Sequence, residues 1–142
     1  MAKFPLNLAR DHVIILTATL IGPERSHAIQ LILDTGATYT MVSPEILVRI
    51  GCDPSRYLEK SAITTASGIE YVPFITIPTV RALGSDQHEV KVVAHGLPPN
   101  IPARGLLGLN FLRHFNVHLN FLDEEVEVIA ARKGTKRRAQ SV

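Results

Sequence analysis

The sequence contains one cysteine and no tryptophan in 142 residues. A single thiol, Cys52, excludes an intramolecular disulfide framework and a cysteine-rich zinc site. Long hydrophobic runs are also missing: the most apolar early stretch, residues 13–21, is far shorter than the roughly 20 residues that a membrane-spanning helix requires. We interpret this stretch as a core strand rather than as the core of a signal peptide. These absences favour the reducing cytoplasm and no contact with a membrane.

A large excess of positive charge is missing from most of the chain. The whole sequence has 15 Lys and Arg against 13 Asp and Glu, but five of the basic residues lie in the last twelve positions, where there is no acid. Residues 1–130 therefore carry ten basic and thirteen acidic residues, and we expect no nucleic-acid-binding face. We expect one domain at 12–130, preceded by an extension at 1–11 and followed by a basic, mobile tail at 131–142.

Short β segments with few helices dominate the hydrophobic pattern. The expected strands are residues 13–21, 28–33, 61–65, 69–77, 89–94, 117–121 and 126–129. A helix of about two turns is predicted at 43–51, with Ser43 as N-cap, Pro44 in the first turn and Gly51 as C-cap. A second short helix is expected at 109–114, after a proline-rich loop at 96–104. The sequence thus predicts an all-β fold with one or two short helices.

An acid ends one of these apolar strands. Residues 31–38 read LILDTGAT, so Asp34 is followed by a hydroxyl at Thr35 and by Gly36. A carboxyl at the end of a buried strand is unfavourable unless its charge is shared, hydrogen-bonded or neutralised. The glycine permits close approach of the backbone, and its N–H can reach a carboxylate oxygen. The pattern predicts a carboxylate held rigidly at the bottom of a cleft. The same residues would also fit an ordinary turn at the end of a strand.

Other chemistries find little support. His114, His118 and Asp123 invite a metal site, but they are expected to straddle a helix–strand junction and lack the spacing of zinc-binding helices. Cys52 is expected to be a structural thiol. The sequence has no nucleophile elbow, phosphate-binding glycine loop or dinucleotide fingerprint. We therefore expect neither a metal nor a cofactor.

Two segments together resemble the retropepsin-like (retroviral-type) aspartic protease family. Residues 34–37 match its active-site signature, and residues 105–112, GLLGLNFL, resemble its hydrophobic-hydrophobic-glycine segment, which lies beneath the active-site loop. Residues 64–71 stand where the family has its flap hairpin. Many viral members carry an Arg–Asp ion pair at the positions of Leu109 and Thr38, so the resemblance is to a cellular or bacterial single-domain member. It covers about residues 12–129 and implies a closed acid-protease barrel.

The resemblance also implies the site. The catalytic residues would be Asp34, Thr35 and Gly36, and the substrate would contact Ala37, Thr38, Ala66, Ser67, Gly68 and Ile69. In aspartic proteases two carboxyls about 3 Å apart share one proton; one accepts a proton from water while the other polarises the peptide carbonyl.

This chain has a single Asp-Thr/Ser-Gly motif. Two copies must therefore each supply Asp34, and we expect a C2 homodimer that hydrolyses polypeptides. Because Ala37 cannot donate a hydroxyl hydrogen bond to the carboxylate, activity is expected at mildly acidic to near-neutral pH. Two alternatives remain open at this stage, a non-catalytic module that dimerises or binds polypeptides, and a protease limited to self-processing.

Overall fold

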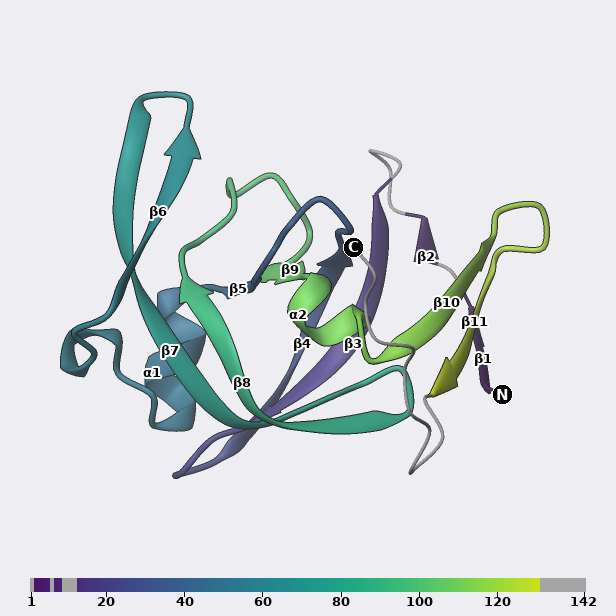
Figure 1. The fold of residues 1–142 in the computed structure, drawn as a ribbon, viewed down its shortest axis with the longest axis horizontal. Coiled ribbons are helices and arrows are strands. Elements are labelled where there is room, and N and C mark those ends of the chain that lie inside the picture. Colours follow the sequence, from purple (N-terminus) through teal and green to yellow (C-terminus); the bar gives the residue numbers. More distant parts are fainter. Residues whose placement is uncertain (1, 6, 9–12, 131–142) are drawn as a thin grey trace, which may run out of the picture.

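A closed ring of strands forms the centre of the molecule. The computed structural model describes residues 2–5, 7–8 and 13–130. In ring order the strands are β3 (Ile14–Ile21), β4 (Ser26–Leu33), β9 (Gly105–Leu107), β5 (Thr40–Val42), β8 (Ser85–Ala94) and β7 (Gly68–Ala82) (Figure 1). Antiparallel pairing of Thr19–Ile21 with Thr79–Arg81 joins β3 to β7 and closes the ring. The predicted all-β closed barrel is confirmed.

The remaining elements attach to this barrel. Strand β6 (Lys60–Thr65) pairs with β7, and β2 (Asn7–Leu8) pairs with β3. A separate sheet has the order β1 (Ala2–Pro5), β11 (Glu125–Ala130) and β10 (Phe115–Asn120). The helices are α1 (Pro44–Ile50), the single 3-10 turn η1 (Pro54–Arg56) and α2 (Leu109–Leu112). None of the helices in the described ranges is long and apolar enough to cross a membrane.

Alternating side chains explain why the strands close around one core. In β4, Ile29, Leu31 and Leu33 are buried while Ala28 and Gln30 are exposed, as expected when successive side chains point to opposite faces. The fully buried side chains come from nearly every ring strand and both α-helices; the largest include Phe111, Leu20, Leu31, Leu47, Ile75, Ile77 and Leu107.

Helix α1 covers one face of the barrel and largely follows the prediction. Its C-cap, Gly51, has φ of +94°, which is easy only for glycine, and Ile46, Leu47 and Ile50 face the core. Ser43 is the N-cap residue, as predicted. Its side chain, however, makes no cap hydrogen bond to the helix and instead donates to the carbonyl of Arg104 at 3.0 Å. Ser43 therefore ties the start of α1 to the loop residue that precedes the second motif.

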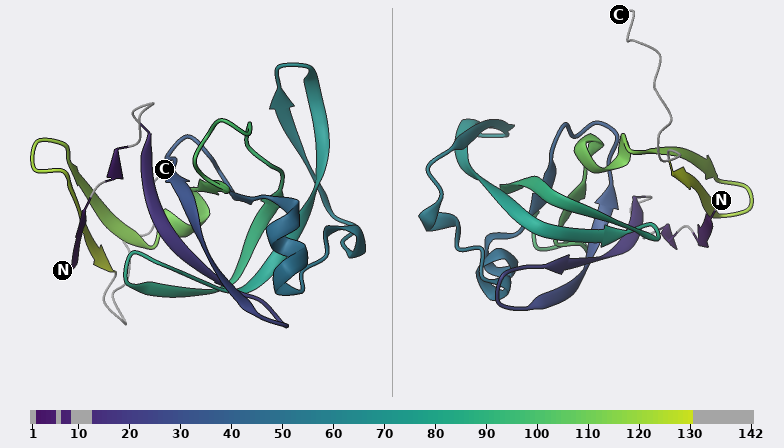
Figure 2. Two further views of the ribbon diagram at one scale, coloured as in Figure 1. Left: turned by 180° about the vertical axis from the view of Figure 1, so that it is seen from behind. Right: turned by 60° about the horizontal axis from the view of Figure 1, so that its bottom comes forward.

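The β6–β7 hairpin was predicted and projects from the barrel in the views of Figures 1 and 2. Strand β7 is longer than predicted, and β8 begins at Ser85 rather than at residue 89. The chain reverses at Leu83 and Gly84, both with positive φ, which is the geometry of a two-residue hairpin turn. Leucine rarely adopts this conformation, so the sequence gives a weak signal for the turn.

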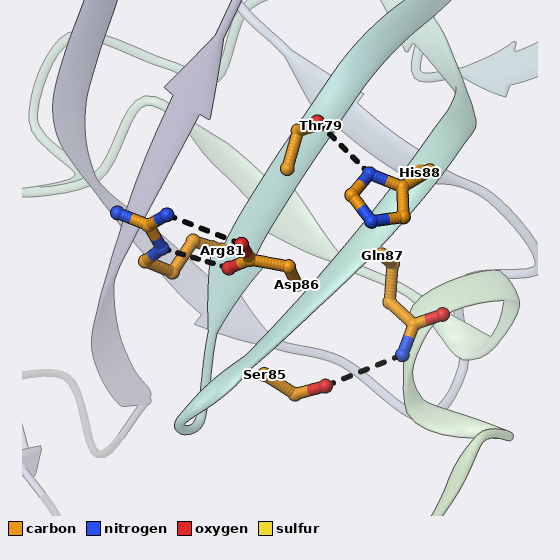
Figure 3. Close-up of polar contacts among 6 residues, drawn as sticks. All are labelled: Thr79, Arg81, Ser85, Asp86, Gln87 and His88. Carbon is orange, nitrogen blue, oxygen red and sulfur yellow. Dashed lines mark hydrogen bonds and ion pairs between the residues drawn. The ribbon is translucent and has the colours of Figure 1, made fainter.

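Cross-strand polar contacts support the end of this second hairpin (Figure 3). Arg81 donates two hydrogen bonds to the carboxylate of Asp86, at 2.7 and 3.1 Å, and Thr79 Oγ1 lies 3.1 Å from His88 Nδ1. The ion pair lowers the pKa of Asp86 below its usual value, chiefly through the hydrogen bonds from Arg81. These pairs hold the register of the β7–β8 hairpin at residues 79–88, outside the strands that the alternating pattern predicted.

The expected N-terminal extension contains strand β1, which pairs antiparallel with β11 of the same chain. The closing hairpin is confirmed as β10 and β11: β10 begins two residues earlier and ends one residue earlier than predicted, and β11 is one residue longer at each end. The tail predicted to be mobile, 131–142, lies outside the described residues.

Cys52 gives a direct test of this packing. The residue is 1% exposed, and burial raises the pKa of its thiol, with a smaller opposing effect from a hydrogen bond to Tyr57. Burial keeps a reagent away from the sulfur, and the raised pKa lowers the fraction of thiolate at a given pH. We expect a thiol reagent at pH 8 to label the native protein at least about ten-fold more slowly than the urea-unfolded chain. Equal rates would show that Cys52 is not buried in solution.

Candidate active site

The loop that carries Asp34 is fixed at its start by two parallel strands. Strand β4 pairs with β9 so that Leu33 lies opposite Leu107, and both side chains are buried. At the next position the N–H of Asp34 donates to the carbonyl of Leu107 at 3.0 Å. The two sequence motifs, far apart in the chain, are therefore joined by backbone hydrogen bonds where the acid leaves the sheet.

The carboxyl group itself is oriented by its own loop. The Gly36 N–H donates to Asp34 Oδ1 at 2.8 Å, and the Ala37 N–H donates to the carbonyl of Asp34 at 3.2 Å. A Cβ on Gly36 would lie only 3.2 Å from the same carboxylate oxygen, so glycine permits the approach. Asp34 is half-buried, and Thr35 is exposed beside it.

The second motif lies directly beneath this loop. A Cβ on Gly108 would come within 2.7 Å of the carbonyl oxygen of Tyr39 and 2.8 Å of that of Ala37, so only glycine fits without movement of the backbone. The N–H groups of Leu109 and Asn110 donate to the carbonyls of Ala37 and Thr38, at 2.8 and 3.1 Å. The free N–H groups at the start of α2 thus satisfy the carbonyls of the active-site loop.

One side chain that the sequence analysis missed completes the support. Asn110 Oδ1 accepts hydrogen bonds from the backbone N–H and the hydroxyl of Thr40, at 2.8 and 2.9 Å. Its Nδ2 donates to the carbonyl of Lys91 at 2.6 Å. Thr40 is fully buried, and its Oγ1 accepts from the Gly108 N–H at 3.1 Å. Asn110 therefore joins the end of the active-site loop, α2 and β8.

This neutral network lies next to Thr38 and Leu109, the two positions at which the resemblance placed an ion pair in many viral members. Both residues are exposed in this structure. The only sequence signal for the network is an amide side chain two residues after Gly108. Its partner is 70 positions away in the chain, so sequence spacing alone could not identify it.

A cleft of about 640 Å³ opens above Asp34. The active-site loop forms one wall with Asp34, Gly36, Ala37, Thr38 and Tyr39, and β6 forms the opposite wall with residues 61–64. Met41, Val93 and Leu106 also line it. Asp34 is the only carboxylic acid in this described lining, which is otherwise uncharged.

The hairpin tip predicted to contact substrate lies away from the cleft. Ala66, Ser67, Gly68 and Ile69 are exposed and do not line the cavity around Asp34. The tip is closed locally: Thr65 Oγ1 donates to the Gly68 carbonyl and accepts from the Ser67 N–H, at 3.1 and 3.3 Å. In this structure the residues that face Asp34 are on β6, so the contacts assigned to the tip stay a prediction.

The alternative metal-binding residues are not gathered into one site. In the part of the chain that the structure describes, no three His, Cys, Asp or Glu side chains are placed to share a metal ion. Asp123 instead closes the β10–β11 turn, where its Oδ2 accepts from the side chain of Asn120 and its N–H donates to Asn120 Oδ1, each at 3.0 Å.

Comparison with known proteins gives the same classification as the site. Residues 25–114 match the family described as "gag-polyprotein putative aspartyl protease". The fold resembles the crystal structure of a retropepsin-like aspartic protease from Rickettsia conorii, with a TM-score of 0.68, 20% identity and 89% of each chain covered. No curated protein matches this chain. Because the family match spans most of the sequence, the chain belongs to the retropepsin-like aspartic protease family.

The contribution of Asn110 can be measured in the unfolding equilibrium. Asn110→Ala would leave the buried N–H and hydroxyl of Thr40 without their acceptor, so we expect the free energy of unfolding to fall by about 2 kcal/mol. Urea titration followed by circular dichroism measures the change. Asn100→Ala, at an exposed loop position, is the matched control and should change stability by less than about 0.5 kcal/mol. Similar losses in both variants would contradict the assigned role.

Proposed function

We propose that this protein is an aspartic endopeptidase that acts as a C2 homodimer, with one Asp34 carboxyl from each subunit activating the attacking water. The observation that carries the proposal is the Asp34 carboxyl, held by the Gly36 N–H at 2.8 Å in the wall of a 640 Å³ cleft. The chain belongs to the aspartic protease family and positions one carboxylate in this way. The catalytic pair then lacks only the second carboxylate, which a second copy would supply. The catalytic unit would be the domain at 12–130.

The chemistry follows from placing two such groups together. Two carboxyls about 3 Å apart cannot both ionise, so the pair holds one proton. The ionised member accepts a proton from water, and the protonated member donates a hydrogen bond to the peptide carbonyl that the water attacks. In this proposal the Gly36 N–H orients each carboxylate, and Thr35 stabilises the two loops by bonding across the interface. No metal or cofactor takes part.

The arrangement of strands supports a subunit that folds alone and meets its copy at the active-site loops. One chain supplies a single Asp34, and a two-fold axis beside that residue would bring the two copies face to face. Strand β1 pairs with β11 of the same chain, and β1 and β10 are the two edge strands of that sheet. The terminal strand β1 is therefore paired within its own chain along one edge.

The substrate in this proposal is an extended polypeptide. Strand β6 is the last strand of its sheet, and its residues 61–64 line the cleft opposite Asp34. A free strand edge beside the reactive group can pair with a peptide as an added strand, which recognises its backbone. Ala37 and Thr38 would contact the same peptide from the other wall. Closure of the β6–β7 hairpin as a flap would bring Ala66, Ser67, Gly68 and Ile69 to the substrate and exclude water.

Removing the charge of Asp34 tests the function. Asp34→Asn keeps the shape of the side chain but cannot act as a base, so we expect cleavage of a mixed peptide library to fall by about 1,000-fold or more. Sedimentation equilibrium should show the same dimer for the variant and for the natural sequence.

Three outcomes of that experiment would contradict the proposal. Unchanged cleavage by Asp34→Asn would assign the activity elsewhere. A natural chain that dimerises but never cleaves would be a binding module. Loss of mass from the protein itself, without cleavage of any library peptide, would indicate self-processing only.

The pH dependence tests the loop chemistry. Among the described residues, the hydrogen bond to the Asp34 carboxyl is donated by the Gly36 N–H, and Ala37 has no hydroxyl to add another. A donor favours the ionised carboxylate and moves the working range to lower pH. We expect a rate maximum at mildly acidic to near-neutral pH, and a shift to lower pH in Ala37→Ser. A single maximum in the strongly acidic range, or an unshifted Ala37→Ser profile, would contradict this.

A further inference from the structure

A second cavity adjoins the cleft and shares one wall residue with it. It has a volume of about 270 Å³, and Tyr39 lines both spaces. The ring of Tyr39 packs edge-on against Phe74, with centroids 4.8 Å apart, which fixes the partition between them. The far side of this cavity is formed by β8 and by the residues that follow α2. A polypeptide that leaves the cleft past Tyr39 would enter this cavity next.

The two cavities differ in chemistry. The side chains that line the cleft are uncharged apart from Asp34, whereas those that line the second cavity include the basic or imidazole side chains of His88, Lys91, Arg113 and His114. Glu89 is the only carboxylic acid in that lining, and it makes no ion pair with any described residue.

Most of these groups already have partners. Lys91 Nζ lies 2.8 Å from Glu59 and 4.3 Å from the ring centroid of Phe74. His88 contacts Thr79 across the hairpin, as Figure 3 shows. Arg113 differs, since no carboxylate of a described residue lies within 4.0 Å of it. Arg113 is therefore the cation in this lining with a free charge.

We propose that this cavity is a substrate subsite for a carboxylate side chain, an aspartate or glutamate that flanks the segment held in the cleft. The inference rests on the proposed function, since it concerns a peptide bound beside Asp34. The planar guanidinium of Arg113 can donate two parallel hydrogen bonds to a carboxylate. In a C2 dimer each half would carry one such subsite, so the preferred substrate would have an acid toward one or both ends of the segment held in the cleft.

The expected effect is modest and sensitive to salt, because Arg113 is exposed. Exposed ion pairs contribute little in water, so we expect an acidic flanking residue to raise kcat/KM about three-fold over its amide analogue. The preference should decrease as ionic strength rises and the Debye length shortens. It should act mainly on association and KM, since the group is remote from the reacting atoms.

The test uses the full chain and pairs of peptides that differ only in Glu or Gln at one flanking position, with that position scanned along the peptide. The natural sequence should prefer Glu at one or more positions, Arg113→Gln should lose the preference, and Arg113→Lys should recover part of it. The matched control is Arg25→Gln, at an exposed position in the β3–β4 turn, which should keep the preference.

Two results would overturn the subsite: no preference for Glu at any position, or a preference that survives Arg113→Gln. Failure of the proposed function gives a different result, with no peptide cleaved at all. In that case fluorescence anisotropy of labelled Glu and Gln peptides on the same variants still decides the question, because a carboxylate subsite predicts tighter binding of the Glu peptide that depends on Arg113.

Discussion

The structure of the site depends on the contact between the active-site loop and the segment beneath it. The loop must leave the sheet and hold a carboxylate still, which leaves the carbonyls of Ala37 and Thr38 without strand partners. The first N–H groups of α2 donate to these two carbonyls, and Gly108 allows the approach because it has no Cβ. Asn110 then joins the end of the loop to β8. Rigidity at Asp34 is thus provided by residues about 70 positions later in the chain.

The parts that the sequence predicted are those with local causes. The acid, hydroxyl and glycine of residues 34–36 sit next to each other, so the hydrogen bond from Gly36 to Asp34 could be expected from the chain itself. Helix α1 ends at Gly51 because glycine adopts the left-handed conformation, and the β6–β7 hairpin follows from alternation around a short turn. The closed barrel was available only through the resemblance, since no local pattern specifies the pairing of β3 with β7.

The strands and side-chain contacts that the sequence did not predict depend on partners that are distant in the chain. Strands β5 and β9 have three residues each, too few for a periodic pattern, and they exist because they pair with β8 and β4. Ser43 is the N-cap residue of α1, as predicted, yet its hydroxyl donates to the carbonyl of Arg104 rather than to the helix. The role of Asn110 required knowing that Thr40 is buried beside it. In each case tertiary contacts, rather than propensity, determine what the residue does.

Under the proposed function, the fold closes within one chain while the site needs two chains, and the two have separate energetic requirements. The barrel is closed by β3 and β7 of the same subunit, and β1 pairs with β11 of that subunit, so these strand pairs are made within one chain. Under the proposed function, the interface has only to bring two prebuilt loops together. Dimerisation can then be weak without exposing the core, and the second carboxylate becomes available only when subunits meet. Activity would follow the dimer concentration, while stability of the fold would not.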